Sequence, residues 1–185
     1  RTIAFFGGST TWGTGADDDR TIPSEFAKLN PEYRAFNFGE TGYVAHQSLN
    51  RFLEHYFEGF RPDVVVFYDG VNDVWHKCRQ ELGPYSHSRE FTIRTALRES
   101  GSGSGESFWI TVLPIRNFVE KAVRTLENKK LAEADYYDCH KNPQKAAQIA
   151  RNLLFDWWIA KNVVESYGGT FVPILQPVIY FSETR

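Results

Sequence analysis

Short apolar runs alternate with amphipathic segments along most of this chain. Two of these runs, Thr2–Phe6 and Asp63–Tyr68, are apolar over most of their length, which is typical of strands buried on both faces. Two further runs, Arg34–Phe38 and Thr170–Leu175, are also predicted to be strands. We expect the first two to lie at the centre of a parallel sheet, because strands that alternate with helices pair in parallel.

Helical segments are predicted between these strands. Apolar residues recur every three or four positions in Val44–Phe57 and along the longer segment Ala146–Val164, which ends before Gly168 and Gly169. A shorter helix, Pro23–Leu29, has proline near its first turn, where proline is tolerated. The alternation therefore predicts a three-layer α/β domain with helices on both faces of the sheet.

The alternation breaks between Arg79 and Asn142. A Gly-Ser run at positions 100–105 has the composition of a flexible linker, and a helix is predicted around Phe118–Leu126. We treat residues 1–185 as a single domain in which the segment 79–142 is an insertion near the ligand-binding edge of the sheet. The insertion is either a lid over that edge or a surface excursion without a role.

Composition excludes several classes of protein. Of the 185 residues, 42% are hydrophobic and 16% aromatic, which excludes disorder and is enough for a full core. The formal charge of −2 gives no basic surface for nucleic acid, and no apolar run reaches the length of a membrane span. We expect no cofactor and no metal site: Cys78 and Cys139 lack Cys-x-x-Cys spacing, and they form either one disulfide or two buried thiols.

The first strand ends in a glycine-rich turn that carries a hydroxyl. Gly7, Gly8 and Ser9 follow the strand directly, at the edge of a parallel sheet where ligands bind. Ser9 is therefore a candidate nucleophile; alternatively, it only caps the helix that follows. No lysine follows at the spacing of a phosphate-binding P-loop, and Thr11 occupies the place of the second glycine of a nucleophile elbow.

Two further turns are expected at the same edge. The second strand is followed by residues 37–42, which end in Gly42, and the third by residues 69–73, which include Asn72. An acyl-transfer site needs a nucleophile and hydrogen-bond donors aimed at the developing oxyanion. Ser9 can supply its hydroxyl and its own N–H, Gly42 a backbone N–H and Asn72 a side-chain amide. The three turns together predict such a site.

In these three turns the chain resembles the SGNH (GDSL-type) hydrolases. The resemblance rests on Gly-Gly-Ser-Thr at the first turn, Asn-x-Gly-x-x-Gly at the second and Gly-x-Asn-Asp at the third. It implies a flavodoxin-like sandwich and esterase chemistry, with Ser9 as nucleophile and Gly42 and Asn72 as oxyanion-hole donors. Gly8 stands where the family often has aspartate. Five positions around these residues are candidates for substrate binding: Gly8, Thr10, Gly70, Asp73 and His76.

One motif of that family is not found in the C-terminal part of the chain. The Asp-x-x-His block, which supplies the general base, is not found after Asp73, although Leu175–Pro177 resembles the strand-end segment that precedes the last motif in some members. None of the five histidines matches the base: His46, His55, His76, His87 and His140. We expect that block and a fifth strand beyond Arg185. A serine without a base is a poor nucleophile, so we expect these residues alone to be weakly active or inactive. A histidine bonded to the Ser9 hydroxyl would overturn that expectation.

The predicted function is that of a serine esterase. Its substrate would be a carboxylic ester of a lipid, a short-chain acyl group or an O-acetylated carbohydrate. The alternatives are a non-catalytic or acyl-binding relative and an acyltransferase. Because the chain has no methionine and begins one residue before a strand, we expect any signal peptide or anchor to lie outside it. The sequence favours an extracellular, periplasmic or membrane-anchored location and leaves a cytoplasmic one open.

Overall fold

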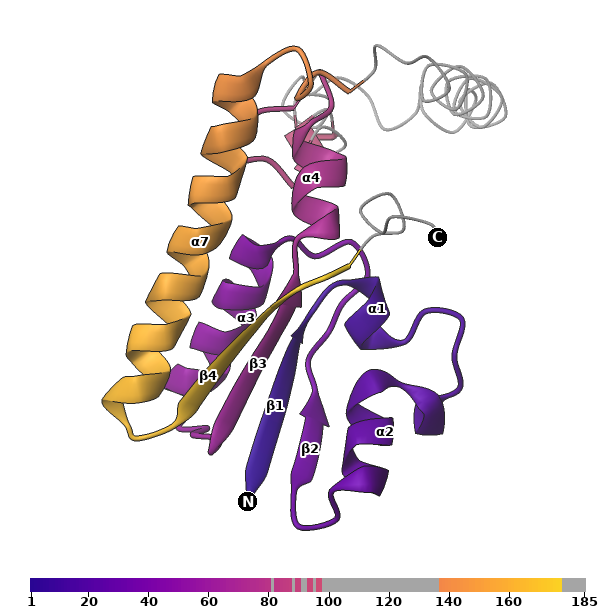
Figure 1. Cartoon of the computed structure of the whole chain (residues 1–185), viewed down its shortest axis with the longest axis vertical. Coiled ribbons are helices and arrows are strands. Elements are labelled where there is room, and N and C mark those ends of the chain that lie inside the picture. The colour runs from indigo at the N-terminus through magenta and orange to yellow at the C-terminus, as the bar shows by residue number, and fades with distance from the viewer. Residues whose placement is uncertain (81, 88, 91–92, 95, 98–136, 178–185) are drawn as a thin grey trace, which may run out of the picture.

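The two continuously apolar runs form the centre of the sheet. In the computed structural model the four strands are parallel and lie in the order β2-β1-β3-β4, so that β1 (Thr2–Gly7) and β3 (Val64–Asp69) are internal (Figure 1). The strands β2 (Arg34–Asn37) and β4 (Thr170–Leu175) flank them. The predicted pair of central strands is confirmed. The order itself is that of the first four strands of a flavodoxin-like sheet.

The structure describes residues 1–80, 82–87, 89–90, 93–94, 96–97 and 137–177. The helices described there are α1 (Ser9–Trp12), the 3₁₀ helix η1 (Asp18–Arg20), α2 (Ile22–Leu29), α3 (Ala45–Phe57), α4 (Val71–Lys77) and α7 (Pro143–Ser166). Within these ranges no helix has the length and apolar character that crossing a membrane requires. The Gly-Ser run and the helix predicted around Phe118–Leu126 lie outside the described residues, so the insertion stays a prediction.

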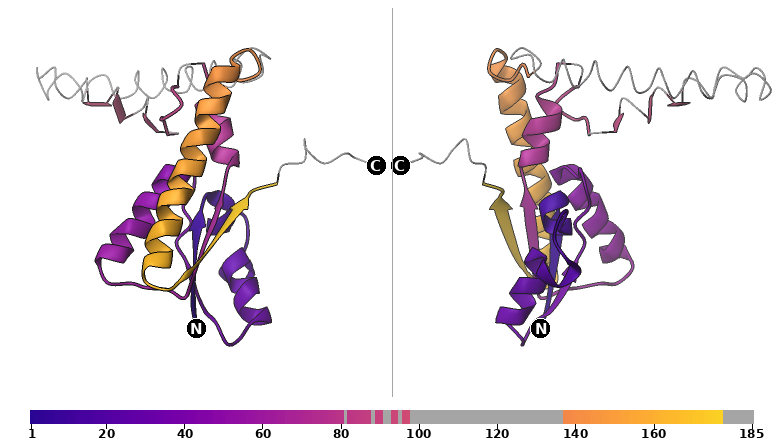
Figure 2. Two further views of the ribbon diagram at one scale, coloured as in Figure 1. Left: turned by 60° about the vertical axis from the view of Figure 1, so that its left-hand side comes forward. Right: turned by 90° about the vertical axis from the view of Figure 1, so that its right-hand side faces the viewer.

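Helices cover both faces of the sheet (Figure 2). On one face α3 and α7 pack against Phe6 and Phe67, and the ring centroids of Phe6 and Phe52 are 5.7 Å apart. On the other face Phe5 meets Phe26 of α2, with 5.5 Å between the centroids. Neighbouring residues of β1 therefore face opposite helical layers, which explains why this run is apolar without alternation. The three-layer α/β fold is confirmed.

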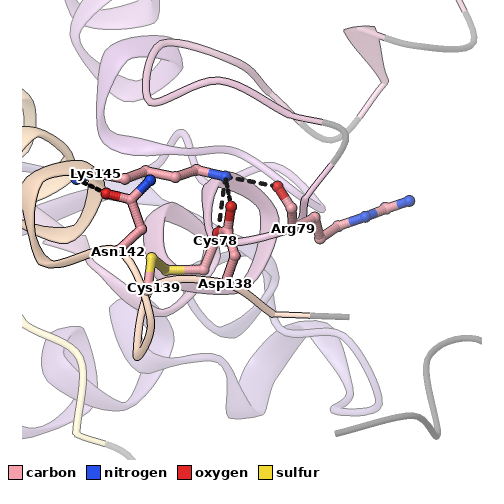
Figure 3. The surroundings of a disulfide bond; sticks show 6 residues. All are labelled: Cys78, Arg79, Asp138, Cys139, Asn142 and Lys145. Atoms are coloured by element: carbon pink, nitrogen blue, oxygen red, sulfur yellow. Dashed lines mark hydrogen bonds and ion pairs between the residues drawn. A yellow bond between two sulfur atoms is a disulfide. The ribbon is translucent and has the colours of Figure 1, made fainter. Parts of the chain in front are cut away.

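A disulfide between Cys78 and Cys139 joins the end of α4 to the turn before α7 (Figure 3). Their Cα atoms are 5.2 Å apart, and the residues are separated by 61 positions in the chain. Of the two alternatives that the sequence leaves open, the structure has the disulfide. Such bonds persist in oxidising compartments.

Lys145 of α7 reinforces the same junction. Its ammonium group donates to the carbonyl of Arg79 at 2.8 Å and to Oδ1 of Asp138 at 2.9 Å, and its side chain is only 9% exposed. The side chain of Asn142 caps α7 by accepting a hydrogen bond from the Lys145 backbone N–H at 3.0 Å. Arg79 and Asp138 are thus held next to each other, although a long segment separates them in sequence (Figure 3).

Replacing both cysteines tests how much this junction stabilises the fold. The double variant Cys78→Ser, Cys139→Ser should lose about 2–5 kcal/mol of unfolding free energy, because the open chain regains conformational freedom when unfolded. Urea unfolding followed by circular dichroism measures the difference. Dithiothreitol should destabilise the wild type and leave the double variant unaffected. Superimposable unfolding curves for the oxidised wild type and the double variant would contradict the expected contribution.

Candidate active site

The first and third turns touch at Gly7 and Gly8. A Cβ atom added to Gly7 would lie 2.5 Å from the carbonyl oxygen of Tyr68, and one added to Gly8 would lie 2.5 Å from Nδ2 of Asn72. A Cβ atom cannot approach a backbone carbonyl this closely, so the contact with Tyr68 requires glycine at position 7, and the Asn72 side chain fills the space beside Gly8. Ser9 follows immediately as the first residue of α1 and is half-buried. The Asn72 amide therefore lies next to the residue that precedes the candidate nucleophile.

The second turn meets the other two through Gly39 and Tyr43. A Cβ atom on Gly39 would lie 2.5 Å from the backbone nitrogen of Trp12, so this turn packs directly on α1. The Asn72 amide donates to the carbonyl of Tyr43 at 2.8 Å. Gly42, the residue before Tyr43, has a φ of 80°, which is in the left-handed region that favours glycine. All three predicted turns thus come together around Gly8.

The Asn72 side chain has a second hydrogen-bond donor. A primary amide carries two N–H groups, and the bond to Tyr43 uses one of them. The other can face a ligand placed beside Ser9, since Nδ2 lies against Gly8. The same amide therefore fixes the second turn and is available as an oxyanion donor. Its assignment as a catalytic residue stays a prediction, as do those of Ser9 and Gly42.

Asp73, the next residue, has its carboxylate bound inside the protein. Only 1% of Asp73 is exposed, and its Oδ2 accepts a hydrogen bond from the backbone N–H of Ala45 at 3.0 Å. Its Oδ1 accepts from Nζ of Lys77 at 2.6 Å, and the side chain of Lys77 is 2% exposed. Both oxygens are thus used to attach the third turn to α3 and α4. Asp73 therefore orients this turn, and its part in substrate binding stays a prediction.

Thr10 and Gly70 contact the segment that follows β4. The side-chain amide of Gln176 donates to Oγ1 of Thr10 at 2.7 Å, and the Gln176 backbone N–H donates to the carbonyl of Asp69 at 2.8 Å. A Cβ atom on Gly70, which has a φ of 119°, would lie 2.5 Å from Cδ1 of Leu175. The strand-end segment that the resemblance singled out therefore reaches the residue next to Ser9.

No histidine within the described ranges forms a hydrogen bond with the Ser9 hydroxyl. His46 instead binds Oδ1 of Asp156 through Nδ1 at 3.0 Å, and this bond to the carboxylate raises the pKa of the imidazole. His55 binds Glu58 in the same way at 3.1 Å. The structure thus pairs two of the histidines with acidic residues elsewhere on the helices, and the base for Ser9 is not among them.

His76, the histidine predicted to line the site, lies on α4 and is half-buried. Burial lowers the pKa of its imidazole, and the positive charge of Arg79 adds to the effect. Its Nδ1 has no hydrogen-bond partner among the described residues. Two other histidines, His87 and His140, are respectively half-buried and exposed. A role for His76 in substrate binding stays a prediction.

Asp69, at the end of β3, is a buried acid that sequence reasoning did not single out. It is 3% exposed; Oδ1 accepts from the Ser48 hydroxyl at 2.9 Å and Oδ2 from the Trp157 indole N–H at 3.4 Å. Burial, with the nearby Asp73 carboxylate acting in the same direction, raises the pKa of Asp69 to about 7. In the sequence, the only sign of this residue was an acidic side chain at the end of an apolar run. The residue anchors the start of the third turn to α3 and α7.

Asp69 makes the stability of the fold depend on pH. Between pH about 4 and 7 the folded protein keeps a proton that the unfolded chain has lost, so stability should fall as the pH rises through this window. Asp69→Asn removes this group and should flatten the profile. Urea unfolding midpoints from pH 4 to 8 measure how stability depends on pH. Subtracting the profile of the variant from that of the wild type cancels the contribution of His46, which both proteins contain.

Asp63→Asn is the matched control, because hydrogen bonds from Thr2 lower the pKa of the exposed Asp63 carboxyl. The stabilisation that Asp63 provides is present above its unfolded pKa and is lost only as the pH falls below it. This variant should therefore keep the wild-type slope between pH 4 and 7. Parallel profiles for wild type and Asp69→Asn would show that Asp69 does not hold the proton.

Comparison with known proteins finds likenesses among solved structures alone. The chain matches no protein-family model and no curated protein. A mutant of the esterase AlinE4 is 23% identical with a TM-score of 0.38, over 45% of each chain. A lipolytic protein of the G-D-S-L family from Veillonella parvula is 16% identical with a TM-score of 0.39, over 54% of this chain and 53% of that one. In both cases the match spans only about half of the solved chain.

A longer alignment is found with AlinE4 itself, described as an SGNH-hydrolase family esterase. It covers 94% of this chain and 76% of that one, at 16% identity and a TM-score of 0.39. Solved structures of this family are therefore among those to which the chain is similar. In its three motifs, the chain resembles the SGNH hydrolases.

Proposed function

We propose that the protein is a serine hydrolase that cleaves a carboxylic ester through an acyl-Ser9 intermediate. One observation carries this proposal: the Asn72 amide is held by the Tyr43 carbonyl and lies against Gly8, so three separate strand ends converge beside Ser9. Convergence of a hydroxyl with amide donors is what acyl transfer needs, because the oxyanion that develops must be met by donors already in place.

The reaction would proceed in two steps. Oγ of Ser9 attacks the acyl carbon, the bond from that carbon to the alcohol oxygen breaks, and the proton of Ser9 ends on the departing alcohol. The N–H groups of Ser9, Gly42 and Asn72 stabilise the oxyanion. Water then attacks the acyl-Ser9 ester, releasing the acid and restoring the hydroxyl. A base must carry the proton in both steps, and the resemblance implies a histidine of an Asp-x-x-His block for this role.

The alternative is a protein that binds acyl groups or esters without cleaving them. It is favoured by a specific observation, which is that no histidine in the described part of the chain bonds to Ser9. The two functions differ in whether Ser9 becomes covalently modified, because binding alone leaves its hydroxyl unchanged.

Replacing Ser9 decides between these functions. In the full-length protein, Ser9→Ala should abolish hydrolysis of p-nitrophenyl acetate and labelling by a fluorophosphonate, which modifies activated serines. Ser166→Ala is a matched control, because Ser166 is an exposed hydroxyl at the far end of α7 and should keep both activities. A folded wild-type protein that neither hydrolyses the ester nor takes the label would contradict the hydrolase proposal. Equal rates for wild type and Ser9→Ala would remove Ser9 from the mechanism.

Asn72→Ala tests the oxyanion donor. We expect kcat to fall about 10²–10³-fold with little change in KM, since the donor acts mainly in the transition state. The variant should also lose about 1 kcal/mol of stability with its bond to Tyr43. Asn152→Ala is the control: its amide makes a similar bond to the Pro84 carbonyl at 3.0 Å, away from the three turns. It should lose similar stability and keep its kcat. A kcat loss no larger than that of the control would exclude Asn72 as a donor.

A further inference from the structure

The side-chain amide of Gln176 links the end of β4 to the helix that carries Ser9. Its Nε2 donates to Oγ1 of Thr10 at 2.7 Å, although 166 positions separate the two residues in the chain. We propose that Gln176 is a positioning residue for the nucleophile: it acts through Thr10 to hold Ser9 in the orientation that acyl transfer requires. This inference rests on the proposed esterase function and adds to it a residue that lies outside the three turns.

The helix α1 cannot hold Ser9 in place by itself. It has four residues, which are too few to stabilise a helix on their own. Gly8 at its N-cap has no side chain that could accept a hydrogen bond from the first turn. The orientation of α1 must therefore come from contacts with other parts of the fold.

Side chains from two other strands bind α1 from opposite sides. Asn37, at the end of β2, donates through Nδ2 to the Trp12 carbonyl at 3.3 Å. Gln176 binds Thr10 from the side of β4, and because β3 lies between β1 and β4, this bond spans the end of β3 (Figure 1). The first bond holds the last residue of α1, and the second holds the residue next to Ser9. Of these two bonds, that of Gln176 is the one nearer in sequence to the nucleophile.

The backbone of Gln176 is fixed at the point from which its side chain reaches α1. Its N–H donates to the carbonyl of Asp69 at 2.8 Å, one residue beyond the paired residues Asp69 and Leu175. The side chain of Leu175 lies against Gly70. The start of the third turn and the end of β4 are thus joined, so the amide of Gln176 holds α1 at a set distance from both.

This hydrogen bond contributes more to geometry than to the stability of the fold. Thr10 is exposed and Gln176 is half-buried, so water can bond to both groups when they separate. A glutamine side chain also loses rotamer freedom when it is held, which offsets much of what the bond contributes. Displacing a reacting group by about 1 Å, in contrast, can lower a rate roughly a hundredfold. Loss of the bond should therefore lower kcat and leave the melting temperature nearly unchanged.

Replacing Gln176 tests this assignment. In the full-length protein, Gln176→Ala should lower kcat for p-nitrophenyl acetate about 10- to 100-fold, with little change in KM or in the melting temperature. Gln176→Glu should recover most of the loss, because the Thr10 hydroxyl can donate to the carboxylate in its place. Gln148→Ala is the matched control: its Nε2 bonds to Oδ1 of Asn152 at 2.8 Å within α7, and the variant should keep its kcat.

A double-mutant cycle shows whether Gln176 acts through Thr10. Thr10→Val removes the oxygen that accepts the bond, so the double variant should lose no more kcat than the weaker of the two single variants. Losses that multiply would overturn the inference, because the two side chains then act separately. So would a wild-type kcat in Gln176→Ala, a rise in KM alone, which indicates contact with the substrate, or a kcat loss that only accompanies early melting.

A folded wild type that hydrolyses no ester would contradict the proposed function instead. The position of Ser9 is then followed without catalysis, through its backbone amide resonance in nitrogen–proton correlation spectra. This resonance should shift in Gln176→Ala and stay in place in Gln148→Ala. A Ser9 resonance that is the same in wild type and Gln176→Ala would overturn the positioning role, whether or not the protein is an esterase.

Discussion

The arrangement of the candidate site depends on two adjacent side chains that form hydrogen bonds with the backbone on either side of Val44. Asn72 donates to the carbonyl of Tyr43, and Asp73 accepts from the N–H of Ala45. The charge on Asp73 is tolerated in the interior because Lys77 lies 2.6 Å from its other oxygen. An unpaired charge buried to this degree would cost several kcal/mol, so the pair persists as a unit. The second and third turns are therefore held in one geometry without any ligand.

Much of the fold could be predicted from the order of apolar runs. The central strands were recognisable because Thr2–Phe6 and Asp63–Tyr68 have no polar face, and a strand without a polar face must be covered on both sides. The location of the three turns followed, since the carboxyl ends of parallel strands share one edge. The observed ends of strands and helices differ slightly from the predicted ends, because the last turn of a helix depends on capping residues that the hydrophobic periodicity does not reveal.

The contacts between distant segments could not be predicted in the same way. The sequence made Asp73 a candidate for substrate binding but did not show its bonds to Ala45 and Lys77, which depend on how α3 and α4 sit against each other. Asp69 gains Ser48 and Trp157 as partners from 21 and 88 positions away. A cavity lined by Trp12, Glu40 and Arg51, among others, forms only where α1, the second turn and α3 are packed together. Side chains of this kind have no local pattern, because their partners are brought together only by the packed fold.

The junction at Cys78 and Cys139 has a consequence for how this fold can be altered. The chain leaves the body at Arg79 and returns at Tyr137, and these two residues pair in an antiparallel bridge. The disulfide and Lys145 hold the two ends of the intervening stretch at this junction, and Asn152 of α7 binds the Pro84 carbonyl within it at 3.0 Å. A foreign domain grafted between Leu97 and Tyr137 would therefore start and end beside a junction that the disulfide and Lys145 already hold, and is expected to leave the sheet and its three turns as they are.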